Sequence, residues 1–141
     1  MSKAKSKKPR TSVIDNISPG FTERSDRGKA SNRRGKVFER DVANKLKAIF
    51  PRAARSYGQS REGHETPDVV GTPLWIECAK GSTNAIHDKL RQGLEASKLS
   101  QSDAYAGAPV AVFSKHDRAG LEMVTMRSDH FLALMKKLYA K

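Results

Sequence analysis

Three residues that could do chemistry lie in one short stretch of the chain, TPDVVGTPLWIECAKG, at positions 66 to 81. Asp68 and Glu77 are acids in largely apolar surroundings, and Lys80 follows them closely. Carboxylates are the oxygen ligands that Mg²⁺ and Mn²⁺ prefer, and a metal held by them can activate water and neutralise a phosphate. Two acids and a lysine in so short a span therefore suggest metal-assisted phosphodiester chemistry.

The same stretch predicts how the two acids meet. Residues 67–71 and 74–80 are typical of two strands joined by a tight turn at Gly71. Side chains on a strand alternate between its faces. One face of the second strand would then carry Trp75, Glu77 and Ala79, and the other, packed on a helix, Leu74, Ile76 and Cys78. Because Asp68 comes from the neighbouring strand, its carboxylate and that of Glu77 can converge.

The lysine of this stretch is displaced by one position. A lysine two residues after Glu77 would point into the same pocket, where it could orient the water or offset the charge of a phosphate. That position is occupied by Ala79. In a regular strand Lys80 points to the opposite face, and it reaches the acids only through a bulge or a strand end at Gly81.

A helix upstream supplies a third acid. Its apolar residues Phe38, Val42, Leu46 and Ile49 recur at helical spacing and predict an amphipathic helix of about four turns. We expect Ser31 or Asn32 to cap this helix and Pro51 to close it.

Within this helix, Glu39 lies beside the apolar stripe. An acid that faces the protein there is unfavourable unless a cation or a metal compensates it. Taken alone, the position also allows a carboxylate at the rim that is paired with Arg40 or Lys36.

The remaining sequence predicts a small α/β domain. Apolar patterns and turn residues indicate strands at 53–59, 67–71, 74–80, 108–115 and 121–126, and helices at 81–100 and 128–140. Ser128 is the expected cap of the last helix. The order is α-β-β-β-α-β-β-α, which predicts a mixed β-sheet flanked by helices.

Composition limits the possible partners. The chain has 141 residues and a formal net charge of +12, which favours a polyanionic partner, most often nucleic acid, over an acidic membrane surface or an acidic protein. Cys78 is the only cysteine, which excludes an intramolecular disulfide and a Cys-rich zinc site. With no apolar run of transmembrane length and no signal-peptide pattern, we expect a reducing, cytoplasmic setting, that of the host if a phage encodes the chain.

The charge is concentrated near the N-terminus. Residues 1–34 contain ten Lys or Arg and three acids, a net of +7 out of +12. They show little apolar periodicity, so we expect a flexible basic arm at 1–30 and a folded domain at 31–141. Such an arm either binds phosphates or serves only as a solubilising tail.

Taken together, the ordered motifs resemble the PD-(D/E)xK nuclease superfamily, and within it the Holliday junction resolvases of phages and microbes. The resemblance covers roughly residues 33 to 139 and is carried by GKVFER, RSYGQSREG, PDVV, WIECAKG and LRQGLE. It implies a restriction-endonuclease-like fold and a Mg²⁺- or Mn²⁺-dependent, structure-selective DNA endonuclease that resolves four-way junctions. It also implies a homodimer, because symmetric cutting of a four-way junction needs two sites.

The resemblance assigns roles to individual residues. Asp68 and Glu77 match the two metal ligands, assisted by the backbone carbonyl of Cys78, and Glu39 matches the helix glutamate that completes the metal site. Gln92 matches a polar residue of the following helix near the active centre. The residues expected to bind DNA are Arg33, Arg34, Arg40, Arg55, Ser56, Gln59, Ser60 and Arg61.

The departure from the family pattern falls at Ala79, where the catalytic lysine belongs. Either this residue was changed on purpose to trap an inactive complex, or Lys80 has taken over the role, or the chain is a natural binding module without chemistry. Two other functions therefore stay open beside junction resolution. One is a nuclease of the same fold with another DNA substrate, of restriction or repair type, and the other is a non-catalytic basic DNA-binding protein.

Overall fold

The computed structural model describes residues 19–57, 65–80, 83–116 and 120–140. The chain forms two compact units, Met1–Arg33 and Arg34–Lys141, which divide close to the predicted boundary after residue 30. The elements in chain order are α1 (Pro19–Leu46), β1 (Ala54–Arg55), β2 (Val69–Val70), β3 (Trp75–Lys80), α2 (Thr83–Leu99), β4 (Val110–Lys115), β5 (Glu122–Thr125) and α3 (Ser128–Tyr139). This is the predicted order.

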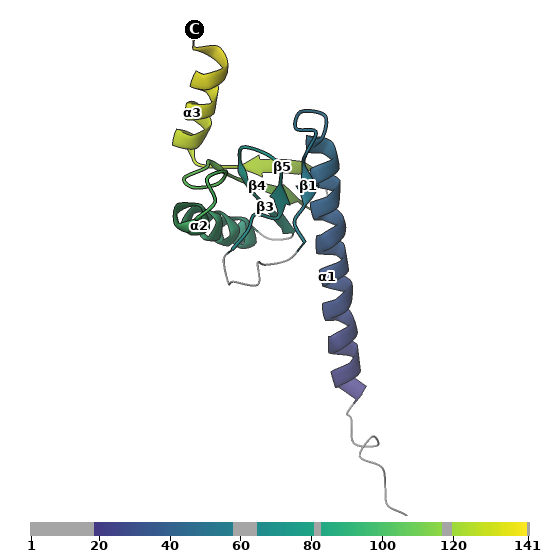
Figure 1. The fold of residues 1–141 in the computed structure, drawn as a ribbon. Coiled ribbons are helices and arrows are strands. Elements are labelled where there is room, and N and C mark those ends of the chain that lie inside the picture. Colours follow the sequence, from purple (N-terminus) through teal and green to yellow (C-terminus); the bar gives the residue numbers. More distant parts are fainter. Residues whose placement is uncertain (1–18, 58–64, 81–82, 117–119, 141) are drawn as a thin grey trace, which may run out of the picture. The chain divides into compact units, whose positions relative to one another are not determined.

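The strands of the described chain form one mixed sheet in the order β1-β2-β3-β4-β5 (Figure 1). β3 and β4 are parallel, with Glu77 opposite Val112, and the other neighbouring pairs are antiparallel. A parallel pair needs a crossover connection, and α2 provides it. The predicted mixed α/β architecture is therefore confirmed.

The core is built on both faces of β3. On one face, Ile76 and Cys78 pack against the α1 residues Phe38 and Val42. On the other face, α2 covers the sheet in two clusters, formed by Trp75 with Ala96, Ala108 and Val110 and by Ala79 with Ile86 and Val112. The predicted alternation along β3 is thus confirmed, and both of its faces are buried under helices.

Several element boundaries differ from the sequence prediction. α1 already begins at Pro19, so Ser31 and Asn32 lie inside the helix and do not cap it, and residues 19–30, which were predicted to belong to a flexible arm, are helical. Proline is favoured at the first position of a helix, and no further proline interrupts the segment. Ile49 follows the end of α1 and is 70% exposed, so it is not part of the core.

Other predicted elements are shorter or capped differently. β1 and β2 have two residues each, fewer than the predicted strands, and residues 58 and 59 of the first lie outside the described chain. Ser128 is the first residue of α3 rather than its cap, because Arg127 is the N-cap and makes no side-chain capping hydrogen bond. In the described part of the chain, no helix is long and apolar enough to cross a membrane.

Candidate functional site

The predicted acids line one cavity of about 270 Å³. Its walls come from α1, the segments next to β1 and β2, the middle of β3, and α2. The lining residues are Glu39, Arg55, Ser56, Glu65, Thr66, Pro67, Asp68, Glu77, Lys89 and Gln92. The structure therefore brings Glu39, Asp68, Glu77 and Gln92 together, as the sequence predicted.

Asp68 lies where the pairing of β2 with β3 ends. Its backbone N–H donates to the carbonyl of Ile76 at 2.8 Å, which continues the ladder by one residue. The next backbone N–H of β3 on this edge, that of Cys78, is bound by the side chain of Asp68 instead of its backbone: Oδ2 accepts a hydrogen bond of 2.8 Å from it. The side chain of Asp68 is thus fixed beside β3 by the edge of the sheet itself.

Glu77 is a buried acid, with 7% of its surface exposed. Its Oε1 accepts a hydrogen bond of 2.8 Å from Nε1 of Trp75, two residues earlier on the same face of β3. Burial, together with the nearby charge of Asp68, raises the pKa of Glu77 to about 7. The site therefore holds more negative charge than its buried setting favours.

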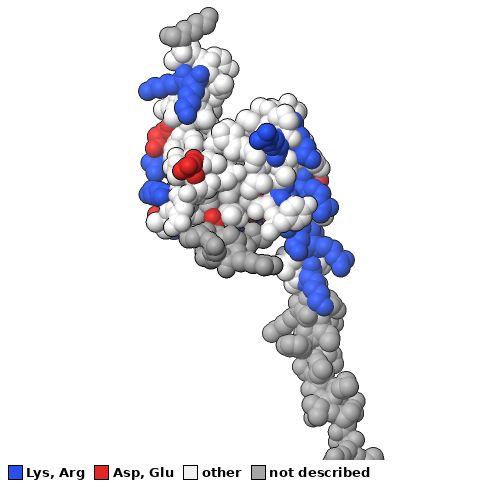
Figure 2. Space-filling model, in the orientation of Figure 1, with Lys and Arg blue, Asp and Glu red and all other residues white. Residues whose placement is uncertain are grey.

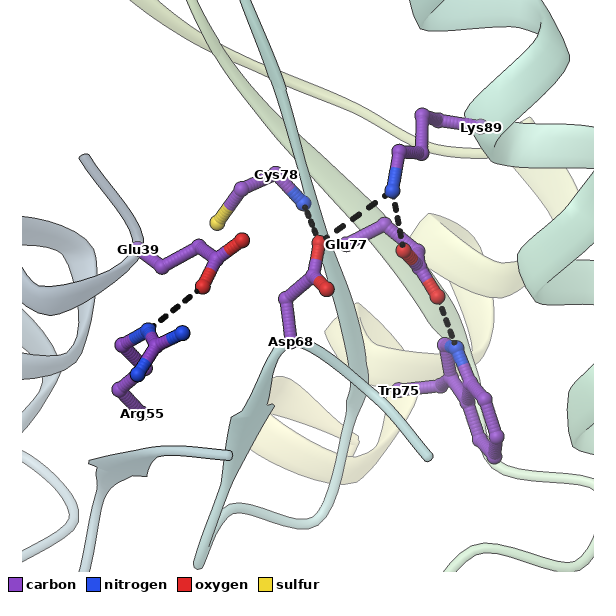
Figure 3. Close-up of polar contacts among 7 residues, drawn as sticks. All are labelled: Glu39, Arg55, Asp68, Trp75, Glu77, Cys78 and Lys89. Atoms are coloured by element: carbon purple, nitrogen blue, oxygen red, sulfur yellow. Dashed lines mark hydrogen bonds and ion pairs between the residues drawn. The ribbon is translucent and has the colours of Figure 1, made fainter. Parts of the chain in front are cut away.

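Lys89 of α2 partly compensates that charge. Its Nζ lies 3.3 Å from Oε2 of Glu77 and 3.6 Å from Oδ2 of Asp68, so one ammonium contacts both acids (Figure 3). Partial burial alone would lower the pKa of Lys89, but the two carboxylates outweigh it and hold that pKa above its usual value.

Lys89 is not among the site residues predicted from the sequence. A signal for it was present, because Lys89 lies three residues before Gln92 and three after Ile86, which places all three on neighbouring positions of one helix face. A lysine on the side of α2 that faces the sheet needs a buried partner of opposite charge.

Gly93 lets α2 approach β3 this closely. A Cβ atom at Gly93 would lie 2.7 Å from Cγ1 of Val110, 3.2 Å from Cγ of Glu77 and 3.3 Å from Cδ1 of Trp75. A glycine is therefore needed for the observed separation between helix and strand. This short separation brings the ammonium of Lys89 within reach of both acids.

Glu39 approaches the cavity from α1. It is paired with Arg55 of β1, whose Nε donates to Oε2 of Glu39 at 2.8 Å. The structure thus corrects the alternative that Glu39 pairs with Arg40 or Lys36. Arg55 also lies over the ring of Tyr57, 5.7 Å from its centroid. In Figure 3, Glu39 and Arg55 lie on one side of Asp68, and Glu77 and Lys89 on the other.

Cys78 lies among the three acids. Burial raises the pKa of its thiol, and the charges of Asp68, Glu39 and Glu77 raise it further, so the thiol stays protonated. The N–H and C=O of one strand residue point to the same edge of the strand. Because its N–H binds Asp68, the Cys78 carbonyl points toward the edge where Asp68 lies.

Unlike the acids, Ala79 and Lys80 do not line the cavity. Ala79 shares the face of Glu77, but it is 3% exposed and packs with Ile86 and Val112 under α2. Lys80, at the end of β3, is not among the described residues that line the cavity. The structure thus brings neither of these two candidate positions to the cavity surface.

The predicted DNA-binding residues fall into three groups. Arg55 and Ser56 line the cavity, where Oγ of Ser56 lies 3.2 Å from Oγ1 of Thr66. Arg34 and Arg40 are exposed on α1, and Figure 2 shows basic side chains gathered over this helix. Arg33 belongs to the N-terminal unit, and the predicted DNA-binding residues Gln59, Ser60 and Arg61 lie outside the described residues.

The donor set fits a small hard cation bound through water. Among the described residues, no group of three or more His, Cys, Asp or Glu side chains forms a ready metal cluster. Mg²⁺, however, is usually held by one or two carboxylates together with waters and substrate phosphates. Asp68 and Glu77, with the Cys78 carbonyl at the same edge, supply such a set. No family model, curated protein or solved structure matches this chain.

Proposed function

We propose that this chain is a metal-dependent endonuclease of restriction-endonuclease-like fold that hydrolyses DNA phosphodiesters. The observation that carries the proposal is the meeting of Asp68 and Glu77 in one cavity, next to the cations of Lys89 and Arg55. Carboxylates that could hold a metal and cations that could hold a phosphate are the two components that such hydrolysis needs.

The metal would be Mg²⁺ or Mn²⁺. Asp68, Glu77 and the carbonyl of Cys78 would hold it, with Glu39 acting through a water molecule. The bound ion would supply a water of lowered pKa and charge neutralisation at the phosphate. Trp75 orients the carboxylate of Glu77 through its hydrogen bond of 2.8 Å, and the Cys78 N–H orients that of Asp68.

Branched DNA is the proposed substrate, on the strength of the motif order given above. The net charge of +12 supports binding to a polyanion. A symmetric cut across a four-way junction requires two copies of the site, so we propose a homodimer. The exposed apolar residues of α3, which are Phe131, Leu132, Leu138 and Tyr139, offer a surface for that association.

One observation favours a second candidate, a non-catalytic basic DNA-binding protein. Lys89 contacts both Asp68 and Glu77, so the protein itself can neutralise part of the charge of the two acids. A partly buried ion-pair network of this kind also occurs in purely structural roles.

The two candidates are separated by incubating the full chain with a four-way junction and with linear duplex of the same sequence, with Mg²⁺, with Mn²⁺ or with EDTA. We expect metal-dependent cleavage of the junction, lost by at least about a hundredfold in Asp68→Asn, because that change removes a charged metal ligand. Glu95→Gln, an exposed acid on α2, is the control. Junction binding without cleavage of either DNA, with either metal, would favour the binding protein.

A further inference from the structure

The structure places a lysine beside the acids although the strand has none at position 79. Building on the function proposed above, we propose that Lys89 of α2 is the catalytic lysine of this protein. It would contact the phosphate that is cut, in the role that a lysine at position 79 would otherwise have. The chain with Ala79 would then be a competent enzyme as it stands.

Position 79 has no room for a working lysine. Ala79 is 3% exposed, and its methyl group belongs to a cluster with Ile86, Val112 and the partly buried Leu90. A longer side chain there would have to displace α2, and overpacking of this kind is unfavourable. It would also place an ammonium among apolar groups, which is costly without a partner. The alanine is thus a packing residue between β3 and α2.

Lys89 has the reach and the setting that the role requires. Its Nζ lies 3.3 Å from Glu77 and 3.6 Å from Asp68, and the residue lines the same cavity as both. Its side chain is 36% exposed, so the ammonium contacts the acids and can still meet a phosphate that enters the cavity. The side chain is therefore neither sealed in the core nor free on the surface.

The position of the ammonium is set by the packing of α2. Ile86 and Leu90, one turn before and one residue after Lys89, pack against the sheet. Gly93, one turn later, allows the close approach to Glu77 and Trp75. A charged group held in place by packing needs no rearrangement to act on a developing charge, which is the condition for efficient electrostatic stabilisation.

The reaction needs no proton from Lys89. In hydrolysis, the water oxygen forms a bond to phosphorus while the bond from phosphorus to the leaving sugar oxygen breaks. One proton of the water passes to the solvent, and the leaving oxygen takes up a proton. Lys89 keeps its proton throughout, and its charge offsets that of the phosphate oxygens, which is largest in the transition state.

The experiment measures Mg²⁺-dependent junction cleavage by four variants beside the full parent chain. Lys89→Ala is expected to lower kcat by about a hundredfold or more, by analogy with the loss of single electrostatic donors. Junction binding in EDTA should change only a few-fold, because one cation among many adds little to phosphate affinity. Lys98→Ala, which changes an exposed lysine on the same helix, and Lys80→Ala should both cleave like the parent, and Ala79→Lys should not gain activity.

A chemical rescue keeps the test independent of folding. In Lys89→Cys, alkylation with bromoethylamine rebuilds an ammonium on a side chain close to the length of lysine. Cys78 is buried and its thiol pKa is raised, so it should react slowly, and the parent treated in the same way is the control. We expect alkylation to raise the kcat of Lys89→Cys by about tenfold or more.

Each contrary outcome has a distinct meaning. Full activity in Lys89→Ala, or a loss found only in Lys80→Ala, would overturn the role of Lys89 and leave the nuclease function in place. The same holds if the parent is inactive and Ala79→Lys cleaves. If neither of these two proteins cleaves junction or linear DNA with Mg²⁺ or Mn²⁺, both the proposed function and the role of Lys89 are overturned.

Discussion

The helices α2 and α3 have similar amphipathic sequences but opposite surroundings. α2 covers one face of the sheet, buries Ile86, Ala96 and Ser97, and delivers Lys89 to the acids. In α3 no residue is buried, and Leu138 is 70% exposed. The difference teaches that an apolar stripe on a helix shows only that a partner surface is needed. It does not show whether that surface lies in the same chain.

The two helices also place carboxyl groups in opposite electrostatic settings. Glu77, under α2, has a pKa raised to about 7 by burial and by Asp68. On α3, Asp129 is exposed. Slight desolvation acts to raise its pKa, but the guanidinium of Arg127, which donates two hydrogen bonds of 2.9 Å, lowers that pKa below its usual value. Their contributions to stability should therefore change with pH in opposite directions.

The largest effect is expected for Glu77→Gln in metal-free protein. The folded pKa of Glu77 exceeds its ordinary value of 4.5, so the parent loses stability as pH rises from about 4.5 to 7 and stays at that lower level above. Glutamine does not titrate. The variant should therefore be more stable than the parent at pH 8, by up to about 3 kcal/mol, and the difference should shrink toward pH 4.5. Urea unfolding in EDTA at several pH values measures it.

Asp129→Asn is the opposite control. The pKa of Asp129 is lower in the folded protein than in the unfolded chain, so its carboxylate stabilises the fold above the unfolded pKa, and this stability is lost as pH falls through the folded pKa. Asp129→Asn should therefore be slightly less stable than the parent at neutral pH and as stable as the parent at low pH. If the difference in free energy of unfolding between Glu77→Gln and the parent did not change with pH, the raised pKa of Glu77 would be contradicted. Added Mn²⁺ should stabilise the parent more than Glu77→Gln, because a ligand stabilises the state that binds it.

A smaller effect is expected from Gly93→Ala, which tests the close packing of α2. The new methyl group would meet Val110, a fully buried side chain, at 2.7 Å. Overpacking of about 1–3 kcal/mol is partly offset by the better helix propensity of alanine, about 1 kcal/mol, so we expect a net loss of up to about 2 kcal/mol. If Lys89 has the proposed catalytic role, junction cleavage should fall as well, because Lys89 would move away from the acids. Thermal unfolding and the cleavage assay check both.

Gly35→Ala on α1 is the matched control for a helical glycine. A methyl group there would meet nothing within 4 Å, so only the gain in helix propensity remains. This variant should be as stable as the parent or more so. A Gly93→Ala protein that is equally stabilised and fully active would show that α2 does not need its close approach to β3.

The smallest effect on folding is expected on α3. Leu132 and Leu138 are 57% and 70% exposed, so replacing both by serine removes little buried surface. Stability should change by less than about 0.5 kcal/mol. If α3 joins two copies of the chain, sedimentation should show a dimer for the parent and a monomer for Leu132→Ser/Leu138→Ser. The Lys137→Ser variant should stay dimeric, and a double variant that stays dimeric would exclude this surface as the contact.

The sequence determined much of this protein by itself. The order of elements, the two faces of β3 and the convergence of Asp68 with Glu77 follow from local periodicity and a tight turn, both of which act over a few residues. The helical position of Glu39 predicted only that it faces the protein, and the resemblance to the nuclease superfamily implied that Glu39 and Gln92 lie near the active centre; both line the cavity. The start of α1 and the exposure of Ile49 were predicted wrongly, because helix ends depend on weak local preferences.

Only the tertiary structure decided which lysine meets the acids. Lys89 is twelve positions from Glu77 along the chain, on another element, and their contact depends on how closely α2 crosses β3. That separation is set by Gly93 and by the packing of Ala79 with Ile86, which no periodicity reveals. Likewise, the stripe of α3 is visible in the sequence, but its exposure is not, because burial is a property of the neighbours that the fold brings to a residue.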